Sequence, residues 1–380
     1  MLGRFLDESF APEVRTDVTT LTVTRLTANA CYRFSAPFLA TIARGLDVSL
    51  EQVGVALAIA ELSGLLSPLT GRVVDRNGHR RAMIAGLLGM ACGTALAACS
   101  QGVPMFAVAL VVLSQSKVVF DIGLGSWIAT HVPYERRGVV VGITETSWAL
   151  GLLVGVSLMG LVTAFTNWRG GYVLACAGVL TMATIVASRV ARDQHVVPTH
   201  PVVSGHPSRS GLDRAGWLAA GGAFCLMASS QCLALSAVTF ALGLGELTSS
   251  ITSARRTDRW GKERSIALGA GLMVPSAAGL ALWHDSLAAG LVLLVIVVAG
   301  FEFAIVSSLA LASSLVPGSP ARGLGVMIAA GTLGRAVASV PATRLYEDGG
   351  LGWPAVMSAA LASGTVIAMY ARSRARTLVV

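Results

Sequence analysis

Long apolar segments recur along the whole chain and are separated by short polar connections. Each has about 20 residues, enough for a helix to cross the hydrocarbon core of a bilayer. Within that core every backbone N–H and C=O group must be bonded inside the protein, which excludes lipid-exposed loops and open sheet edges. Charged residues make up 13% of the chain, against roughly 25% in soluble domains. The sequence therefore predicts an all-α polytopic membrane protein.

The apolar segments form two groups of six predicted spans. The first group lies at 22–44, 52–70, 82–99, 104–131, 139–165 and 171–189. The second lies at 217–254, 265–283, 287–314, 324–344 and 354–371. Two crossings need about 40 residues, so 217–254 predicts shortened helices 7 and 8, with a turn near Ser229–Cys232 and the first helix truncated. Eleven spans, with a single crossing at 217–254, are the alternative.

The chain divides into five predicted regions. These are a cytoplasmic tail at 1–20, a six-helix half at 21–190, a cytoplasmic linker at 191–214, a second six-helix half at 215–372 and a cytoplasmic tail at 373–380. The linker is predicted from RDQHVVPTHPVVSGHPSRSGLDR (192–214), which holds three prolines and has no helical period. A histidine metal site there is the weaker interpretation, because no ligand spacing repeats.

Lys and Arg residues gather in alternate short loops, and this bias orients a membrane protein. We therefore expect a multi-pass protein of the cell membrane with both termini in the cytoplasm. Because the arginines lie mostly in these loops, the net charge of +8 indicates orientation, and no nucleic-acid partner is expected. The six cysteines lie within apolar stretches, a pattern typical of small core residues rather than of a metal or disulfide site.

Three short motifs occur twice, at nearly the same interval. DRNGHRRAM (75–83) returns as DRWGKERSI (258–266), RRG (136–138) as ARG (321–323), and NWRGGYV (167–173) as GWPAVMS (352–358). Repeated six-helix halves are a common design of membrane transporters, in which the binding site lies between the halves near the bilayer midplane. The repeats therefore predict two related halves around a central site.

The first repeated motif carries a family resemblance. GRVVDRNGHRR (71–81) resembles the pattern G-x-x-x-D-R/K-x-G-R/K-R/K, found between helices 2 and 3 in the major facilitator superfamily, with His79 at the first basic position after the second glycine. ARRTDRWGKERS (254–265) resembles the weaker copy between helices 8 and 9, with Ala254 in place of the first glycine. The resemblance covers residues 20 to 372 and implies the major facilitator fold.

The resemblance also implies a gating role for these loops. In the family, the motif aspartate meets the N-terminus of helix 11 and holds the cytoplasmic side closed. The residues assigned to this gating motif are Gly71, Asp75, Arg76, Gly78, Arg80, Arg81, Asp258, Arg259 and Gly261. Orientation of the chain alone also explains part of the role of the arginines, but it does not explain Asp75.

Helix 5 carries a second resemblance. GITETSWALGLLVGVSLMG (142–160) is similar to the glycine-rich helix of drug–proton antiporters, G-x8-G-x3-G-P-x2-G. Gly142, Gly151 and Gly155 match it, whereas Val156 occupies the proline position and Gly160 comes one residue late. The resemblance favours efflux over uptake, and simple packing of small residues is the alternative explanation.

Ionisable residues inside the predicted spans each require a reason, because insertion of one costs about 3 kcal/mol. The candidates for binding a proton or substrate are Asp121, Glu302, Glu145, Arg33, Lys117, Arg335, Glu61 and Glu246. Asp121, Glu302 and Glu145 are the proton-carrier candidates, in that order. A carboxyl group in an apolar environment binds a proton more tightly than one in water.

Several pairings follow from their spacing. Lys117 and Asp121 share one helix face, either as a self-neutralising pair or as a proton site. Glu145 lies about 12 Å beyond Arg137 along the helix. Two long side chains could narrow this gap and pair near the cytoplasmic mouth, so Glu145 is predicted to be a gate residue or a proton carrier.

Three further interpretations concern different helices. Glu302 and Arg335 lack local partners, and we hypothesise that they pair with each other. Arg33 is expected to bind an anionic substrate or to neutralise Asp121, and snorkelling to an interface is the alternative explanation. Glu61 and Glu246 occupy similar places in the two halves, which favours structural or gating roles.

These features predict a secondary active transporter rather than an enzyme. The chain has no GxGxxG or GxxxxGKS/T motif, so no nucleotide or other cofactor is expected and energy would come from a proton gradient. We expect a monomer in the lipid bilayer that exports small amphipathic or hydrophobic molecules by alternating access. The alternatives are a proton-coupled uptake permease, or a degenerate protein that no longer transports because helix 7 is shortened.

Overall fold

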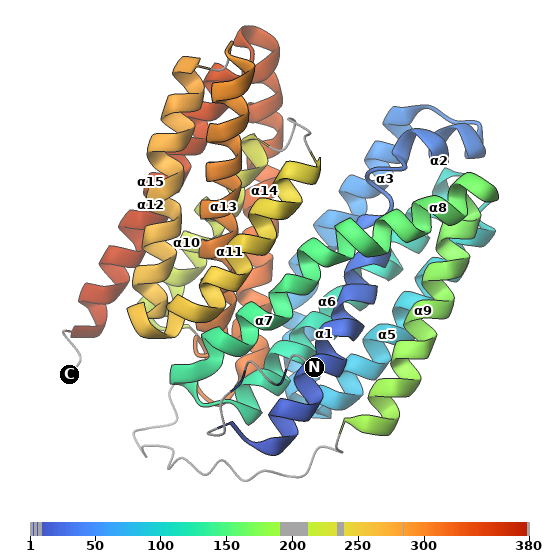
Figure 1. Ribbon diagram of the computed structural model, residues 1–380, viewed down its shortest axis with the longest axis horizontal. Coiled ribbons are helices and arrows are strands. Elements are labelled where there is room, and N and C mark those ends of the chain that lie inside the picture. The colour runs from blue at the N-terminus through green and yellow to red at the C-terminus, as the bar shows by residue number, and fades with distance from the viewer. Residues whose placement is uncertain are drawn as a thin grey trace.

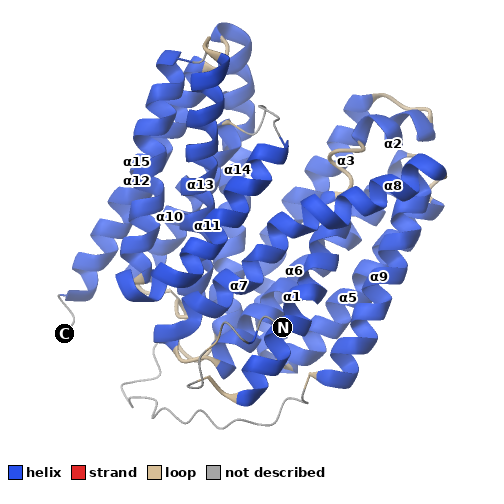
Figure 2. Cartoon of the chain, in the orientation of Figure 1, coloured by secondary structure: helices blue, strands red, loops and turns tan. Residues whose placement is uncertain are grey.

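The structure is a computed structural model that describes residues 3, 6, 10–190, 212–233, 239–283 and 285–377. Over these residues it is helical, with no strand (Figure 2). The helices form two bundles, one on either side of the segment 191–211 in the sequence (Figure 1). The predicted linker lies almost entirely within that segment, outside the described residues. The prediction of an all-α protein is confirmed for the described part of the chain.

The first bundle contains the helices up to residue 190. They are α1 (Pro12–Arg33), α2 (Leu39–Leu46), α3 (Leu50–Leu62), α4 (Ser67–Asn77), α5 (His79–Cys99), α6 (Val103–His131), α7 (Arg137–Leu150), α8 (Ser157–Phe165) and α9 (Trp168–Arg189). Two short segments continue a helix into the next one. The 3-10 segment η2 (Ser63–Leu66) joins α3 to α4, and the π segment η4 (Gly151–Val156) joins α7 to α8. A further 3-10 turn, η3 (Tyr134–Arg136), precedes α7.

The second bundle contains α10 (Arg214–Cys232), α11 (Thr239–Trp260), α12 (Lys262–Trp283), α13 (Leu287–Ala312), α14 (Pro320–Gly349) and α15 (Gly352–Thr377). Among the described residues, nine helices of the two bundles are long and apolar enough to cross a membrane. The helices α1, α10 and α11 are not among these nine, so the count of twelve spans stays a prediction for them.

The first span differs from its predicted bounds. α1 begins at Pro12, within the segment predicted as a tail at 1–20, because Pro suits the first turn of a helix and Val14 and Val18 continue its buried face. The helix ends at Arg33 and a separate short helix, α2, follows Pro37, so the single span predicted at 22–44 is wrong. At the other end of the chain, α15 continues to Thr377, into the predicted tail at 373–380.

The region 217–254 contains two helices, as predicted, but the predicted turn at Ser229–Cys232 is wrong. α10 continues through these residues, because Ser230 bonds back to the Met227 carbonyl and the small side chains pack within the helix. α10 has 19 residues and α11 has 22. α11 thus has an ordinary length, extending to Trp260 beyond the predicted boundary, and only α10 is short.

The two bundles contact each other most extensively along α4 with α14 and α7 with α11, and also where α7 meets α13 and α6 meets α14. The first turn of α1 and the last turn of α15 lie at one end of the molecule, which we call the terminal end (Figure 1). The bundles lie side by side there and diverge toward the opposite end. An added Cβ at Gly142 would lie 2.5 Å from Ala254 Cα, so the α7–α11 contact depends on glycine at this position.

Candidate functional site

Asp75 lies in the last turn of α4 and faces the N-terminus of α14. Its two carboxylate oxygens accept hydrogen bonds from Ala321 N at 3.1 Å and from Arg322 N at 3.2 Å. The first N–H groups of a helix lack partners within the helix and carry a partial positive charge, which a carboxylate satisfies. α14 corresponds to the eleventh predicted span, 324–344. The contact with helix 11 that the family resemblance implied is therefore present, and it crosses between the bundles.

Asp258 makes the equivalent contact in the opposite direction. Its oxygens accept from Gly138 N at 3.0 Å and Val139 N at 2.9 Å, at the start of α7. Lys262 Nζ lies 3.0 Å from Asp258 Oδ1 and also donates to Tyr134 O at 2.7 Å. Each bundle thus contributes one carboxylate that caps a helix of the other bundle. We call these two contacts the inter-half caps.

The other residues of the repeated motif have more local surroundings. Gly78 and Gly261 have φ of 91° and 85°, a conformation that favours glycine, so both allow a tight reversal between helices. Arg80 Nε donates to the Val190 carbonyl at the end of α9, at 2.9 Å. Three arginines, Arg76, Arg81 and Arg259, are exposed. A gating role for these arginines stays a prediction.

The glycines of predicted helix 5, which corresponds to α7, η4 and α8, lie where other helices approach closely. Gly142 faces Ala254 of α11, whereas an added Cβ at Gly151 would lie 2.8 Å from the Cβ of Asn29 in α1. Gly155 faces Ala30 of α1. These contacts are small-residue packing, the alternative that the sequence left open.

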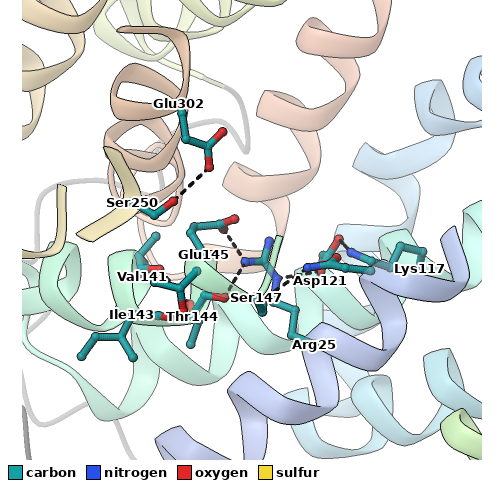
Figure 3. A network of polar contacts seen from close by, with 12 residues as sticks. Arg25, Lys117, Asp121, Val141, Ile143, Thr144, Glu145, Ser147, Ser250 and Glu302 are labelled. Carbon is teal, nitrogen blue, oxygen red and sulfur yellow. Dashed lines mark hydrogen bonds and ion pairs between the residues drawn. The ribbon is translucent and has the colours of Figure 1, made fainter. Parts of the chain in front are cut away.

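Arg25 of α1 joins two carboxylates inside the first bundle (Figure 3). Its Nη1 lies 2.6 Å from Glu145 Oε1, and its Nε lies 3.3 Å from Asp121 Oδ1. Lys117 forms an ion pair with the other oxygen of Asp121, so the predicted Lys117–Asp121 pair is present. The Arg25 guanidinium also donates to the Thr144 carbonyl at 3.3 Å. Two cations and two carboxylates from α1, α6 and α7 therefore form one neutral cluster, the Arg25 network.

Arg25 is a site residue that the sequence patterns did not identify. A first span predicted to begin at residue 22 places Arg25 near the membrane boundary, where a cation needs no explanation. Because α1 begins at Pro12, Arg25 instead lies in the middle of the helix. The signal that could have shown this is the spacing of Val14 and Val18, which extends the apolar face upstream.

Two predicted pairings of this network are wrong. Asp121 is neutralised by Arg25 and Lys117. Arg33 lies eight residues further along α1 and pairs with Glu246 instead. Glu145 pairs with Arg25 and not with Arg137. The Arg137 guanidinium instead donates to Val132 O and to Ser313 Oγ, both at 3.0 Å, because the free carbonyls at the end of α6 lie within its reach.

A cavity of about 120 Å³ lies between the bundles beside the Arg25 network. Its polar lining comes from Arg25, Asp121, Arg137, Thr144, Glu145 and Ser313, and its apolar lining from Leu124, Gly125, Ile128, Val141, Leu309, Leu324 and Ile328. The charged residues all belong to the first bundle, and the second bundle contributes mainly apolar side chains. The volume is sufficient for more than one water molecule beside the charged groups.

Glu302 lies inside the second bundle, on α13. Its side chain is buried, with 3% of the residue exposed, and it accepts a hydrogen bond from Ser250 Oγ of α11 at 3.1 Å (Figure 3). In the described part of the chain no Lys or Arg forms an ion pair with it, so the predicted Glu302–Arg335 pair is wrong. Arg335 points to the other bundle instead, because Glu61 of α3 lies within its reach.

Two ion pairs cross between the bundles away from the inter-half caps. Arg335 Nη2 lies 2.8 Å from Glu61 Oε2, and Arg33 Nη1 lies 3.2 Å from Glu246 Oε2. Each bundle supplies one acid and one base to this arrangement. The similar places of Glu61 and Glu246 in the sequence thus correspond to equivalent contacts with the opposite bundle. We call these the crossed pairs.

Comparison with known proteins identifies the family. A model of the Major Facilitator Superfamily matches residues 21–339. The chain belongs to this superfamily. The predicted resemblance is therefore confirmed, and with it a multi-pass membrane protein.

Curated relatives match only parts of the chain. An uncharacterized MFS-type transporter, YwfA of Bacillus subtilis, is 24% identical over 35% of this chain and 33% of its own length. The MFS efflux transporter aclA of Aspergillus oryzae is 26% identical over 42% and 29%. The multidrug resistance protein MdtG of Serratia proteamaculans is 27% identical over 43% and 41%. The matches thus span less than half the length of each of these three relatives.

Solved structures match nearly the whole chain. The crystal structure of the MFS transporter FucP in its outward conformation has a TM-score of 0.76 at 13% identity, covering 95% of this chain and 99% of that chain. The human organic anion transporter MFSD10 has a TM-score of 0.75 at 17% identity, covering 94% and 100%. At such identities the likeness shows the fold, and with it the two-bundle architecture.

Proposed function

We propose that this transporter exports small amphipathic or hydrophobic compounds from the cell in exchange for protons. The observation that carries the proposal is the set of carboxylates inside both bundles: Asp121, which is 25% exposed, and the buried Glu145 in the first bundle, and the buried Glu302 in the second. No cofactor is needed for such a cycle, since the proton gradient supplies the energy. The protein would act as a monomer in the cell membrane, with the terminal end in the cytoplasm.

Glu302 is the carboxyl group best suited to carry a proton alone. Its side chain is buried, it accepts a hydrogen bond from the Ser250 hydroxyl, and protonation would remove a charge that is costly to bury. Movement of the bundles would change the surroundings of this carboxyl group and thereby its proton affinity.

The Arg25 network supports coupling within the first bundle. One guanidinium serves both Asp121 and Glu145, and Asp121 also lines the inter-half cavity. A proton on either carboxylate would release Arg25 to bind the other more fully. The occupancy of the cavity and the arrangement of the cluster would thereby depend on each other.

The inter-half caps support alternating access. Asp75 and Asp258 hold the helices of opposite bundles together at the terminal end, where the bundles lie side by side. Release of both caps would separate that end while the bundles close at the other, as expected for rocking halves.

Two observations favour export of amphipathic compounds. The cavity has charged side chains on one wall and mainly aliphatic ones on the other, which suits a molecule with a polar and an apolar face. Among the relatives, one is described as an efflux transporter and another as a multidrug resistance protein. Both matches are partial, so the direction of transport needs a direct test.

Everted membrane vesicles with an acidic lumen provide that test. A panel of amphipathic antibiotics and dyes, with sugars and amino acids for comparison, is offered from outside. We expect at least one amphipathic compound to accumulate in the lumen against its gradient while protons leave. The accumulation should stop when the pH gradient is dissipated. Uptake that runs only in the opposite direction would identify an importer instead.

The substitution Glu302→Gln tests the coupling. It should abolish proton movement during transport, whereas Glu135→Gln, a change at an exposed glutamate of η3, should leave it unchanged. If Asp121→Asn, Glu145→Gln and Glu302→Gln all behave like the unmodified protein, the carboxylates do not carry protons. Absence of transport across the entire panel would support a protein without transport activity.

A further inference from the structure

The crossed pair of Glu61 and Arg335 is accessible although Glu61 lies near the middle of the continuous span Leu50–Asn77 and Arg335 near the middle of α14. Their side chains retain 45% and 31% of their exposed area. A charged group at such a depth cannot face hydrocarbon without a large cost, so the exposed part must face water. The pair, which joins α3 of the first bundle to α14 of the second, therefore faces water between the bundles.

Two aromatic residues adjoin this pair. The Tyr32 hydroxyl donates to Glu61 Oε1, and the Tyr32 ring lies 6.4 Å from the ring of Trp148, between centroids. Both side chains are partly exposed. An aromatic face beside a charged pair suits a ligand with a flat apolar body and a polar end.

The second crossed pair is different in exposure. The side chains of Arg33 and Glu246 are only 17% and 14% exposed. The Arg33 guanidinium lies over the Trp148 ring, 4.5 Å from its centroid. Arg33 thereby holds the ring in place from within the protein. A ligand that arrives from water would meet Glu61 and Arg335 first, with Trp148 as the apolar wall beside them.

The charge balance of the accessible pair limits what can bind. A ligand that is only a cation would pair with Glu61 and leave Arg335 without its partner, and a ligand that is only an anion would do the reverse. A ligand with both charges can insert between Glu61 and Arg335 and satisfy both. Its amino group would replace Arg335 at Glu61, and its acidic group would replace Glu61 at Arg335.

We infer that Glu61, Arg335, Tyr32 and Trp148 form a binding site for an ampholyte, a compound with one basic and one acidic group on a flat apolar body. The inference rests on the proposed function, since it names the charge class of the amphipathic substrate. The ligand replaces a contact between the bundles with a contact to each of them. Such a ligand therefore changes the relation between the bundles when it binds, which a transport cycle requires.

Three ligands with the same ring test the charge requirement. Tryptophan carries both charges, tryptamine only the positive one and indole-3-propionate only the negative one. Their affinities are measured by calorimetry on the full-length protein in detergent, without any gradient. We expect tryptophan to bind at least about tenfold more tightly than either singly charged analogue.

Substitutions then separate the two charges. Glu61→Gln should remove the contribution of the amino group, so that tryptophan binds no better than indole-3-propionate. Arg335→Gln should bring tryptophan down to the level of tryptamine. The double exchange Glu61→Arg with Arg335→Glu restores one acid and one base, and should retain the preference for the ampholyte. Glu51→Gln, at the exposed start of α3, is the control that should change nothing.

Two results would overturn the inference: similar affinities for the three ligands, within about threefold, or no measurable binding of tryptophan. Tryptophan binding that is unchanged in both Glu61→Gln and Arg335→Gln would also refute the assignment, since neither charge would then contact the ligand. Because the measurement involves no proton gradient, its result does not depend on whether the protein is a proton-coupled exporter. Failure of one proposal can thus be told from failure of the other.

Discussion

Arg25 and Glu145 form an ion pair of 2.6 Å within the first bundle, and both side chains are less than 10% exposed. The same guanidinium lies 3.3 Å from Asp121. One buried cation thus compensates two carboxylates from two other helices. This makes Arg25 the residue that ties α1 to α6 and α7, and it suggests a first test of the site.

Replacement of Arg25 by Gln should destabilise the protein strongly. It leaves Glu145 without its ion-pair partner and Asp121 with Lys117 alone, and removing one partner of a buried pair costs about 3–5 kcal/mol. The measurement is thermal unfolding of the purified protein in detergent. The double variant Arg25→Gln with Glu145→Gln should recover part of the loss, because it also removes the carboxylate that is left unpaired. An equal loss in the single and double variants would show that Arg25 acts through its packing.

The Arg25 network also shows the limit of what the sequence could predict. Hydropathy and the repeated motifs were sufficient for the helical class and the two halves, because these depend on local pattern and on a recurring loop. The contact of Asp75 with helix 11 was predicted only through the family resemblance. The partners of Arg33, Glu302 and Arg335 were predicted wrongly, because such pairs depend on how helices rotate about their axes and on which bundle they face. The spacing of Lys117 and Asp121 along one helix is sufficient to predict their ion pair. The ion pair of Arg335 with Glu61 joins two helices, and spacing along a helix contains no information on it.

Loss of both inter-half caps should open the terminal end. Asp75→Ala removes the acceptors for Ala321 N and Arg322 N, and Asp258→Ala does the same for α7, so each cost is about 1 kcal/mol, as for other helix caps. Spin labels are placed at Asn77, the last residue of α4, and at Pro317, just before α14, in a background without native cysteines. Double electron–electron resonance then reports the separation of these two helix ends. We expect a longer distance population in the double variant.

A matched control exists for these substitutions. Asp213 caps its own helix, α10, by accepting from Gly216 N at 2.6 Å, and it makes this contact within one bundle. Asp213→Ala should therefore cost a similar amount of stability without changing the distance between the labels. If the double variant and Asp213→Ala give the same distances, the caps do not hold the bundles together.

Glycine at position 142 should be indispensable for the α7–α11 contact. An added Cβ would lie 2.5 Å from Ala254 Cα, too close for any real side chain. Gly142→Ala should therefore force the helices apart and destabilise the protein by about 1–3 kcal/mol, as overpacking does. Gly221→Ala is the comparison, since nothing lies within 4 Å of its added Cβ. That variant should be neutral or more stable by up to about 1 kcal/mol, because alanine favours the helix.

The crossed pairs should differ in their contribution to stability, although both join the same bundles. Glu61→Gln breaks a pair that is 45% and 31% exposed, so water replaces the lost partner and the cost should stay below about 1 kcal/mol. Arg33→Gln leaves Glu246 at 14% exposure without its partner and also removes the contact over Trp148. Its cost should be about 2–3 kcal/mol, by analogy with other buried pairs. Thermal unfolding of both variants, with Glu51→Gln as the exposed control, measures the difference. A larger loss for Glu61→Gln than for Arg33→Gln would mean that the accessible pair, and not the buried one, holds the bundles at mid-depth, and ligand exchange at Glu61 would then be opposed rather than favoured.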